Sequence, residues 1–337
     1  MVSLATVRAS NQGLKAAIPG LTALFVGGTT GIGQSTLRQL AIHAEKPKVY
    51  IIGRSESKAS PFLEDLRKLN PQGSFNFIEQ DVSLMRNVDS ACEAIKSKEG
   101  KLNLLFMTPG GISLSGRQET SEGIDHLFAL RYYSRMRFIQ NLLPLLDSAT
   151  PARVISIFGG GFEFGVNPDD LDLKHNYSII NCAKHAITMT SLAMEHLASS
   201  HPSVSFMHIY PGLVRSNIYT NSFPPPMAAF YNYVAWPMMW PFSVNVQECG
   251  ERHLFHLTSG LYAPKKGSSP AEGVPVPGGL EGAIGSTGQV GGGAYLLNWK
   301  GEGKQAPKTM QKYREEGMPD TVWKHTVDLI SRAAGDA

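Results

Sequence analysis

The sequence predicts an α/β protein, with a doubly wound parallel sheet of about seven strands in a single domain. Short apolar runs alternate with segments of helical period along most of the 337 residues. Such alternation is typical of a parallel sheet that is covered by helices on both faces. With 42% hydrophobic residues, the chain also holds ample material for a buried core, and α/β folds of about 250 residues or more often form one domain.

Seven short apolar runs are interpreted as buried strands, and the segments between them show helical periodicity. The strands are expected at Thr22–Val26, Lys48–Ile52, Phe75–Ile78, Leu102–Phe106, Arg153–Phe158, Val204–Ile209 and Ala294–Trp299. Helices are expected at Gln34–His43, Ser121–Leu146, Asn181–Ala198 and Asp320–Ala334. We expect an N-terminal extension over residues 1–20, a single domain over residues 21–337, and a Gly- and Pro-rich loop over residues 265–293.

Composition excludes several classes of function. The net charge is +3 and dispersed, which does not favour nucleic acid as a partner. The three cysteines, Cys92, Cys182 and Cys249, lack metal-ligand spacing, and a sparse, odd set fits a reducing compartment. The first residues do not resemble a secretory signal, and no run reaches the ~18 apolar residues of a membrane span. The expected location is the cytoplasm.

A glycine-rich turn follows the first predicted strand. Thr22–Val26 runs directly into Gly27-Gly28-Thr29-Thr30-Gly31-Ile32-Gly33, where helical periodicity begins. Glycines let the backbone adopt positive φ and approach a pyrophosphate, and the free amides of the following helix face the anion. In this strand–turn–helix context the motif predicts a Rossmann-type dinucleotide site rather than a tight structural turn. The loop residues expected to bind the cofactor are Gly27, Thr29, Thr30, Gly31, Ile32 and Gly33.

The spacing G-x-x-x-G-x-G resembles the short-chain dehydrogenase/reductase family, whose loop reads TGxxxGIG, although Val26 replaces the usual threonine. The resemblance extends over most of the chain. The family selects its cofactor just after the second strand, where this chain has Arg54-Ser55. A guanidinium there can clamp a 2′-phosphate, whereas an acidic residue would bind the ribose hydroxyls of NAD. The resemblance therefore implies NADP(H), the alternative being an ordinary surface arginine.

Further segments resemble the family's cofactor site. Asp81-Val82 follows the third strand, where the family has an adenine-contacting Asp. The segment Pro211–Ser216 is similar to the PGxVxT motif near the nicotinamide, which assigns cofactor contacts to Pro211, Gly212, Val214 and Ser216. A narrower resemblance links the chain to short-chain dehydrogenase-like proteins of fungal natural-product clusters. It involves Val7–Asn11, the glycine turn, Tyr132–Arg135 and Val322-Trp323.

The catalytic positions of the family are mostly not matched. Members use a tyrosine as general acid, a lysine four residues later, a serine after the fifth strand and an asparagine. Lys184 matches the lysine, but Ile180 stands in the tyrosine position. Gly159–Gly161 follow the fifth strand, and Arg131 falls near the asparagine position. Losing a positioned acid typically costs roughly 10²–10⁴-fold in rate, and losing the oxyanion partner costs more.

Four residues are the candidates for catalytic roles. Tyr177 precedes Lys184 by seven residues, which would place it about 5 Å too far along a helix for the usual geometry. Tyr133 lies on the helix nearest the expected pocket, and either tyrosine could instead pack with its hydroxyl satisfied. Lys184 is expected to bind the ribose unless it is a solvated helix lysine. Arg131 could bind a carboxylate, an enolate or the cofactor phosphate, or form a surface salt bridge.

The family places its substrate lid after the PGxVxT segment, which implies a lid over residues 219–245. Phe223–Phe242 is crowded with prolines, aromatic residues and Met. Such side chains suit a large, apolar small-molecule substrate, the alternatives being a membrane-surface patch or an oligomer contact. The prolines argue against a spanning helix, and a homodimer or homotetramer is compatible with the sequence.

Three functions fit these features, because fold alone does not fix function. The first is an NADP(H)-dependent oxidoreductase that acts on a bulky secondary-metabolite carbonyl or alcohol with a non-standard catalytic site. The second is a redox-silent isomerase, cyclase or dehydratase on the same scaffold. The third is a non-catalytic NADP(H)-binding protein.

Overall fold

A seven-stranded parallel sheet lies at the centre of the molecule. The structure is a computed structural model that describes residues 2–113, 115–214, 223–265, 272–276, 282–304 and 306–335. The strands are β1 (Thr22–Val26), β2 (Lys48–Gly53), β3 (Ser74–Glu79), β4 (Leu104–Met107), β5 (Arg153–Ile157), β6 (Ser205–Ile209) and β7 (Ala294–Leu297). Their order is β3-β2-β1-β4-β5-β6-β7, and every pair is parallel. The predicted fold class and strand number are confirmed.

The central strands are buried on both faces, which explains why they read as continuous apolar runs. Every residue of β1, β4, β5, β6 and β7 is buried, whereas the edge strand β3 is partly exposed. The predicted fourth strand began two residues too early. The Leu102 amide donates to the Leu145 carbonyl, and the Asn103 side chain accepts from the Thr22 amide. The Leu102 amide is therefore engaged outside the sheet, and the paired residues of β4 begin at Leu104.

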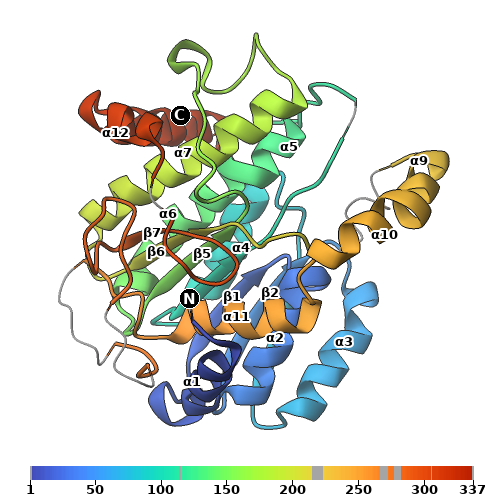
Figure 1. Ribbon diagram of the computed structural model, residues 1–337, viewed down its shortest axis with the longest axis vertical. Coiled ribbons are helices and arrows are strands. Elements are labelled where there is room, and N and C mark those ends of the chain that lie inside the picture. The colour runs from blue at the N-terminus through green and yellow to red at the C-terminus, as the bar shows by residue number, and fades with distance from the viewer. Residues whose placement is uncertain are drawn as a thin grey trace.

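Helices cover both faces of the sheet (Figure 1). One apolar core lies between the sheet and α4 (Met85–Lys96), α6 (Ser134–Asp147), α7 (Ile179–Ser200) and α13 (Met318–Ala334). A second core lies on the other face, against α1 (Leu4–Ala17), α2 (Gly31–His43), α3 (Glu56–Leu69) and α11 (Val246–Thr258). The shorter α12 (Lys308–Glu315) precedes α13. The alternating pattern predicted this burial of the sheet by helices on both faces.

The helix predicted at Ser121–Leu146 is not continuous. Residues 121–125 form a turn, followed by α5 (His126–Phe128), the π-helical turn η1 (Ala129–Tyr133) and then α6. Asp125 caps this start, because its carboxylate accepts from the Phe128 amide at 2.9 Å. Single π-turns occur frequently at functional sites. Here the π-turn carries Arg131.

The N-terminal segment packs on the body of the molecule. The Ser3 hydroxyl caps α1 by accepting from the Thr6 amide at 3.1 Å. Val7 and Leu14 are buried in the second core. The Asn11 side chain donates to the Glu251 carbonyl of α11 at 2.8 Å. The predicted boundary between an extension and a domain at residue 20 stays a prediction.

Residues 223–242 form a helical arm that projects from the body (Figure 1). The arm consists of α9 (Pro225–Phe230), η3 (Tyr231–Ala235), α10 (Trp236–Met239) and η4 (Trp240–Phe242). Its most exposed apolar side chains are Phe230, Tyr233, Met238, Trp240 and Phe242, which expose between 61% and 83% of their surface. Part of the predicted lid and loop, residues 219–222, 266–271 and 277–281, lies outside the described residues. Within the described part of the chain, none of the helices combines the length and apolarity of a membrane span.

Candidate cofactor and active site

The turn between β1 and α2 has the backbone geometry of an anion cradle. Gly27 and Gly31 have φ angles of +85° and +58°, which favour glycine. A Cβ on Gly33 would lie 2.4 Å from the Gly27 carbonyl oxygen, so α2 can begin this close to the turn only with glycine there. Thr30 is the N-cap residue of α2 and makes no side-chain cap bond. The first amides of the helix are therefore available to an anion.

A pocket of about 570 Å³ opens at this turn and crosses the switch point of the sheet between β1 and β4. Residues after β2 and β3 line one end, the glycine turn lines the middle, and residues after β4 and on α5 and η1 line the other end. The lining residues at the two ends are Arg54, Gln80, Asp81, Val82, Thr108, Pro109, Gly110, Gly111, Ile112, Ser113, His126, Leu127 and Leu130. Open α/β sheets bind dinucleotides in this position. The predicted residues Gly27, Thr29, Thr30, Gly31, Ile32, Arg54, Asp81 and Val82 all line this one pocket.

Arg54 stands at the β2 end of the pocket. Its side chain is exposed and has no hydrogen-bond or ion-pair partner among the described residues. Ser55 instead caps α3, with its hydroxyl accepting from the Lys58 amide at 3.4 Å, and it is not a lining residue. The neighbouring Asp81 carboxylate accepts from the Ser83 amide at 3.0 Å. Arg54 is therefore the group at this end that is available to an anionic ligand.

The segment after β6 lies apart from this pocket. Gly212 has a φ of +75°, and a Cβ there would lie 2.8 Å from the Val244 side chain. Val214 forms a parallel bridge with Val244. Pro211, Gly212 and Val214 do not line the pocket, and Ser216 lies outside the described residues. Their predicted cofactor contacts stay predictions.

The structure brings Arg131, Cys182 and Tyr177 together. One Nη of Arg131 donates to the Gly111 carbonyl at 2.8 Å, and the other lies 3.7 Å from the Cys182 sulfur. Burial raises the pKa of Tyr177, and the nearby Cys182 and Asp125 raise it further. A general acid works best when its pKa lies near the operating pH. Tyr177 is therefore held as a weak acid here.

Tyr133 and Lys184 are engaged elsewhere. Tyr133 is fully buried, with its hydroxyl 3.1 Å from His325 Nε2 of α13 and its ring 4.9 Å from that of Phe128. Lys184 places its ammonium 5.7 Å from the ring centroid of Phe164. Neither residue lines the pocket, nor do Arg131 and Tyr177. The catalytic roles predicted for these four residues stay predictions, and none of the four side chains lines the pocket.

The loop after β5 explains why a serine is absent there. A Cβ on Gly159 would lie 2.6 Å from the Ile187 side chain, which leaves no room for a larger residue. The Gly159 amide donates to His208 Nε2 at 3.1 Å, and His208 Nδ1 lies 2.8 Å from the Ser191 hydroxyl. Ser191 in turn donates to the Glu163 carboxylate at 2.8 Å. Burial lowers the pKa of His208 to about 3, which keeps its Nε2 available as an acceptor.

Sequence reasoning missed two features of the site. His126 lines the β4 end of the pocket, and its side chain has no hydrogen-bond partner among the described residues. Arg135 of α6 is fully buried and donates to the carbonyl oxygens of Pro109, in the loop after β4, and Ile157 of β5. The only available signal for His126 was its position just before the apolar run of the following helix. The signal for Arg135 was an arginine within that run.

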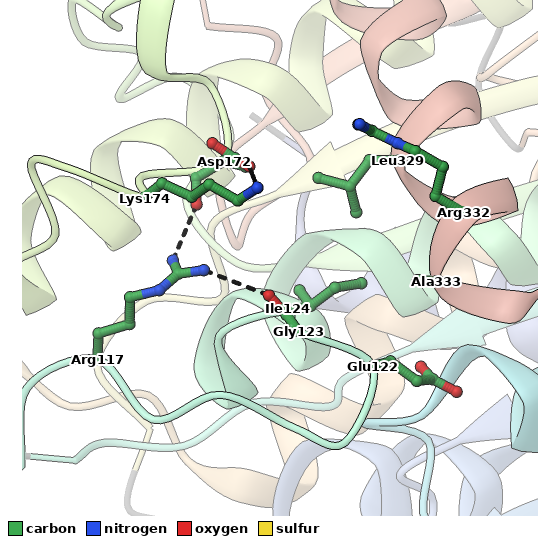
Figure 2. Close-up of a pocket in the computed structure, with 9 residues that line it drawn as sticks. All are labelled: Arg117, Glu122, Gly123, Ile124, Asp172, Lys174, Leu329, Arg332 and Ala333. Carbon is green, nitrogen blue, oxygen red and sulfur yellow. Dashed lines mark hydrogen bonds and ion pairs between the residues drawn. The ribbon is translucent and has the colours of Figure 1, made fainter.

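A second, smaller pocket of about 210 Å³ is lined by polar side chains that are already engaged (Figure 2). Arg117 donates to the Asp172 carbonyl at 3.1 Å and the Leu173 carbonyl at 3.0 Å. The Glu122 carboxylate accepts from the backbone amides of Met85 and Arg86. This pocket therefore lies where the 117–124 loop meets α13, and its polar side chains hold these segments together. Among the described residues, no group of His, Cys, Asp or Glu could hold a metal ion.

Comparisons with known proteins place the chain in one family. The family model for short chain dehydrogenases matches residues 21–226. Oxidoreductase AN1596 of Emericella nidulans is 64% identical over 333 residues, which cover 99% of each chain. Oxidoreductase andH of Emericella variicolor is 40% identical over 345 residues and covers 100% of this chain and 99% of its own.

A solved structure agrees at the level of the fold. L-sorbose reductase from Gluconobacter frateurii superposes with a TM-score of 0.55 at 16% identity, over 77% of this chain and 95% of that one. The chain belongs to the short-chain dehydrogenase/reductase family, as the glycine turn indicated, and it is an oxidoreductase-type member of it.

Proposed function

We propose that this protein is an NADP(H)-dependent oxidoreductase that interconverts a carbonyl and an alcohol on a bulky, apolar secondary metabolite. The observation that carries the proposal is the continuous pocket from Arg54 across the glycine turn to the β4 end. An open helix N-terminus in the middle of that pocket suits a diphosphate. The solved structure of L-sorbose reductase is of a complex with NADPH, which supports a nicotinamide coenzyme in this fold.

NADP(H) rather than NAD(H) is favoured by the charge at the β2 end. Arg54 follows β2 directly, and no acidic side chain occupies its place or that of Ser55. A guanidinium can form charge-assisted, bidentate hydrogen bonds with a phosphate. An NAD-selecting site would instead need a carboxylate for the ribose hydroxyls.

The proton for the carbonyl oxygen is proposed to come from His126. A bound nicotinamide coenzyme supplies the hydride to the carbonyl carbon. In this direction the oxygen gains electrons and must gain a proton, and in the reverse direction it loses one. Among the described side chains that line the β4 end, His126 carries an imidazole, which can exchange a proton with the oxygen. Its free imidazole can donate the proton to the oxygen and take it back.

The arm is proposed to act as the substrate lid. It carries aromatic and Met side chains that are exposed, among them Met238 at 73% and Trp240 at 68%. Exposed apolar patches of this kind mark binding surfaces. A large apolar substrate would cover the patch and gain hydrophobic contacts that a small polar substrate could not.

A redox-silent activity on the same scaffold is the second candidate. The exposed Ile180 stands where the family has its tyrosine, and Gly159 cannot be replaced by a serine without a clash. The two candidates predict different spectra. Oxidoreductase activity requires substrate-dependent consumption of NADPH, seen as loss of absorbance of the reduced nicotinamide. Conversion of a polycyclic ketone or alcohol without that loss would favour the redox-silent reading.

A further inference from the structure

Two buried guanidinium groups lie behind the β4 end of the pocket, and neither has a carboxylate partner among the residues that the structure describes. Arg131 and Arg135 expose 5% and 1% of their surface. The partners of Arg131 are the Gly111 carbonyl and the Cys182 thiol. The partners of Arg135 are likewise neutral oxygens, namely those of Leu130, Ser156, Ile157 and Pro109. Both guanidiniums also stand against the Phe158 ring, at 5.4 and 5.8 Å from its centroid.

Neither guanidinium forms an ion pair among the described residues, although the buried Asp125 carboxylate acts on the same Cys182 and Tyr177 side chains as Arg131. Burial raises the pKa of the Cys182 thiol to about 11, so this partner of Arg131 is neutral. Burial and the nearby Arg131 lower the pKa of Arg135 to about 9, which leaves it a cation at neutral pH. Buried charges in proteins are normally paired, because an unpaired one is costly. The Nε of Arg131 has no hydrogen-bond partner within the described part of the chain.

Both arginines are fastened to the wall of the pocket. Arg131 binds the carbonyl of Gly111 and Arg135 binds that of Pro109, and both Gly111 and Pro109 line the pocket. If a 2′-phosphate meets Arg54 and the diphosphate meets the glycine turn, the nicotinamide must extend to the β4 side of the switch point. The two cations therefore lie directly behind the loop that faces the nicotinamide end.

We propose that Arg131 and Arg135 make this end of the pocket electropositive, so that the protein binds reduced nicotinamide in preference to the oxidised form. The inference rests on the proposed NADP(H) site. The oxidised nicotinamide ring carries a positive charge and the reduced ring carries none. Repulsion by the two buried guanidiniums therefore acts on NADP⁺ alone, and it is little screened because the cations are removed from water.

The test compares the affinities of NADPH and NADP⁺ for the purified full chain by fluorescence and calorimetric titration. The wild-type protein should bind NADPH at least about tenfold more tightly than NADP⁺, which corresponds to about 1.4 kcal/mol. Arg131→Met removes one charge while keeping an apolar stem, and the ratio should fall severalfold through tighter NADP⁺ binding. Arg131→Lys keeps the charge and should keep the ratio.

A third ligand separates charge from distortion of the loop. 2′-Phospho-ADP-ribose lacks the nicotinamide, so its affinity should be the same in the wild type and in Arg131→Met. Equal affinities of the wild type for NADPH and NADP⁺ would overturn the inference, as would an unchanged ratio in Arg131→Met. A loss of 2′-phospho-ADP-ribose binding in that variant would assign Arg131 to the loop instead. Absence of binding of all three ligands would refute the proposed function itself, together with the inference.

Discussion

Arg54 is the residue on which the choice between coenzymes depends in this account. It lines the β2 end of the pocket, and no described residue forms a hydrogen bond or an ion pair with its guanidinium. Arg54→Ala should weaken NADPH binding by about 10- to 100-fold, because a hydrogen bond to a charged group is worth roughly 1.5–3 kcal/mol, and NADH binding should be unchanged. Titration of both coenzymes measures this. Lys58→Ala, which removes a positive charge from the neighbouring α3, is the control and should have little effect; equal losses for both coenzymes in Arg54→Ala would contradict the assignment.

His126 is the residue that should carry the proton. Since a positioned acid typically contributes roughly 10²–10⁴-fold, His126→Gln should lower kcat by at least about 100-fold and leave NADPH affinity intact. His175→Gln removes an exposed histidine and serves as the control. A variant at position 126 with normal kcat would eliminate His126 as the donor.

Among the structural elements, the arm from α9 to η4 is the segment that is proposed to contact an apolar substrate. Met238→Ser combined with Trp240→Ser should raise KM for an apolar substrate by about tenfold or more, because about 25 cal/mol is lost for each Å² of apolar surface left in water. Coenzyme affinity should not change. Ile42→Ser on α2, whose side chain is 48% exposed, is the matched control. An unaltered KM accompanied by loss of self-association or of vesicle binding would assign the arm to an interface instead.

Some of these elements could be predicted from the sequence and others could not. The glycine turn and β1 were predictable because a strand, its turn and the start of the next helix are specified by neighbouring residues. The loop after β5 was not, since its path depends on His208, Ser191 and Glu163, which come from three separate segments. The burial of Arg135 depends likewise on the carbonyls of Pro109, after β4, and Ile157 of β5, which only the folded sheet brings together. The catalytic positions that were carried over by spacing alone stay predictions, and none of these four residues lines the pocket.

For the whole molecule, buried neutral histidines predict sensitivity to acid. Burial lowers the pKa of His253 to about 4 and that of His208 to about 3, and it lowers the pKa of His256 as well. The unfolded chain has ordinary histidines with pKa near about 6.5. Between these pKa values the unfolded state binds more protons than the folded state. The contribution of these histidines to the free energy of unfolding is therefore fully present above about pH 6.5 and decreases as the pH falls toward 4.

This sensitivity can be measured by denaturant titration from pH 7 to pH 4.5. Each such histidine contributes a slope of about 1.4 kcal/mol per pH unit within the window. His256→Phe should flatten the slope by one such contribution, because both ring nitrogens of His256 are buried with no hydrogen-bond partner in the described ranges. His175→Gln, at an exposed position, should leave it unchanged. A stability that does not vary over this range would show that these histidines are not held neutral.

The central claim is that the cradle at Gly27–Gly33 and Arg54 bind a phosphorylated nicotinamide dinucleotide. Isothermal titration calorimetry of the purified protein tests it most directly, with NADPH and NADH as ligands. The account predicts saturable, one-to-one binding of NADPH that is at least about tenfold tighter than binding of NADH. No detectable heat with either coenzyme, together with no protection against thermal unfolding, would contradict it.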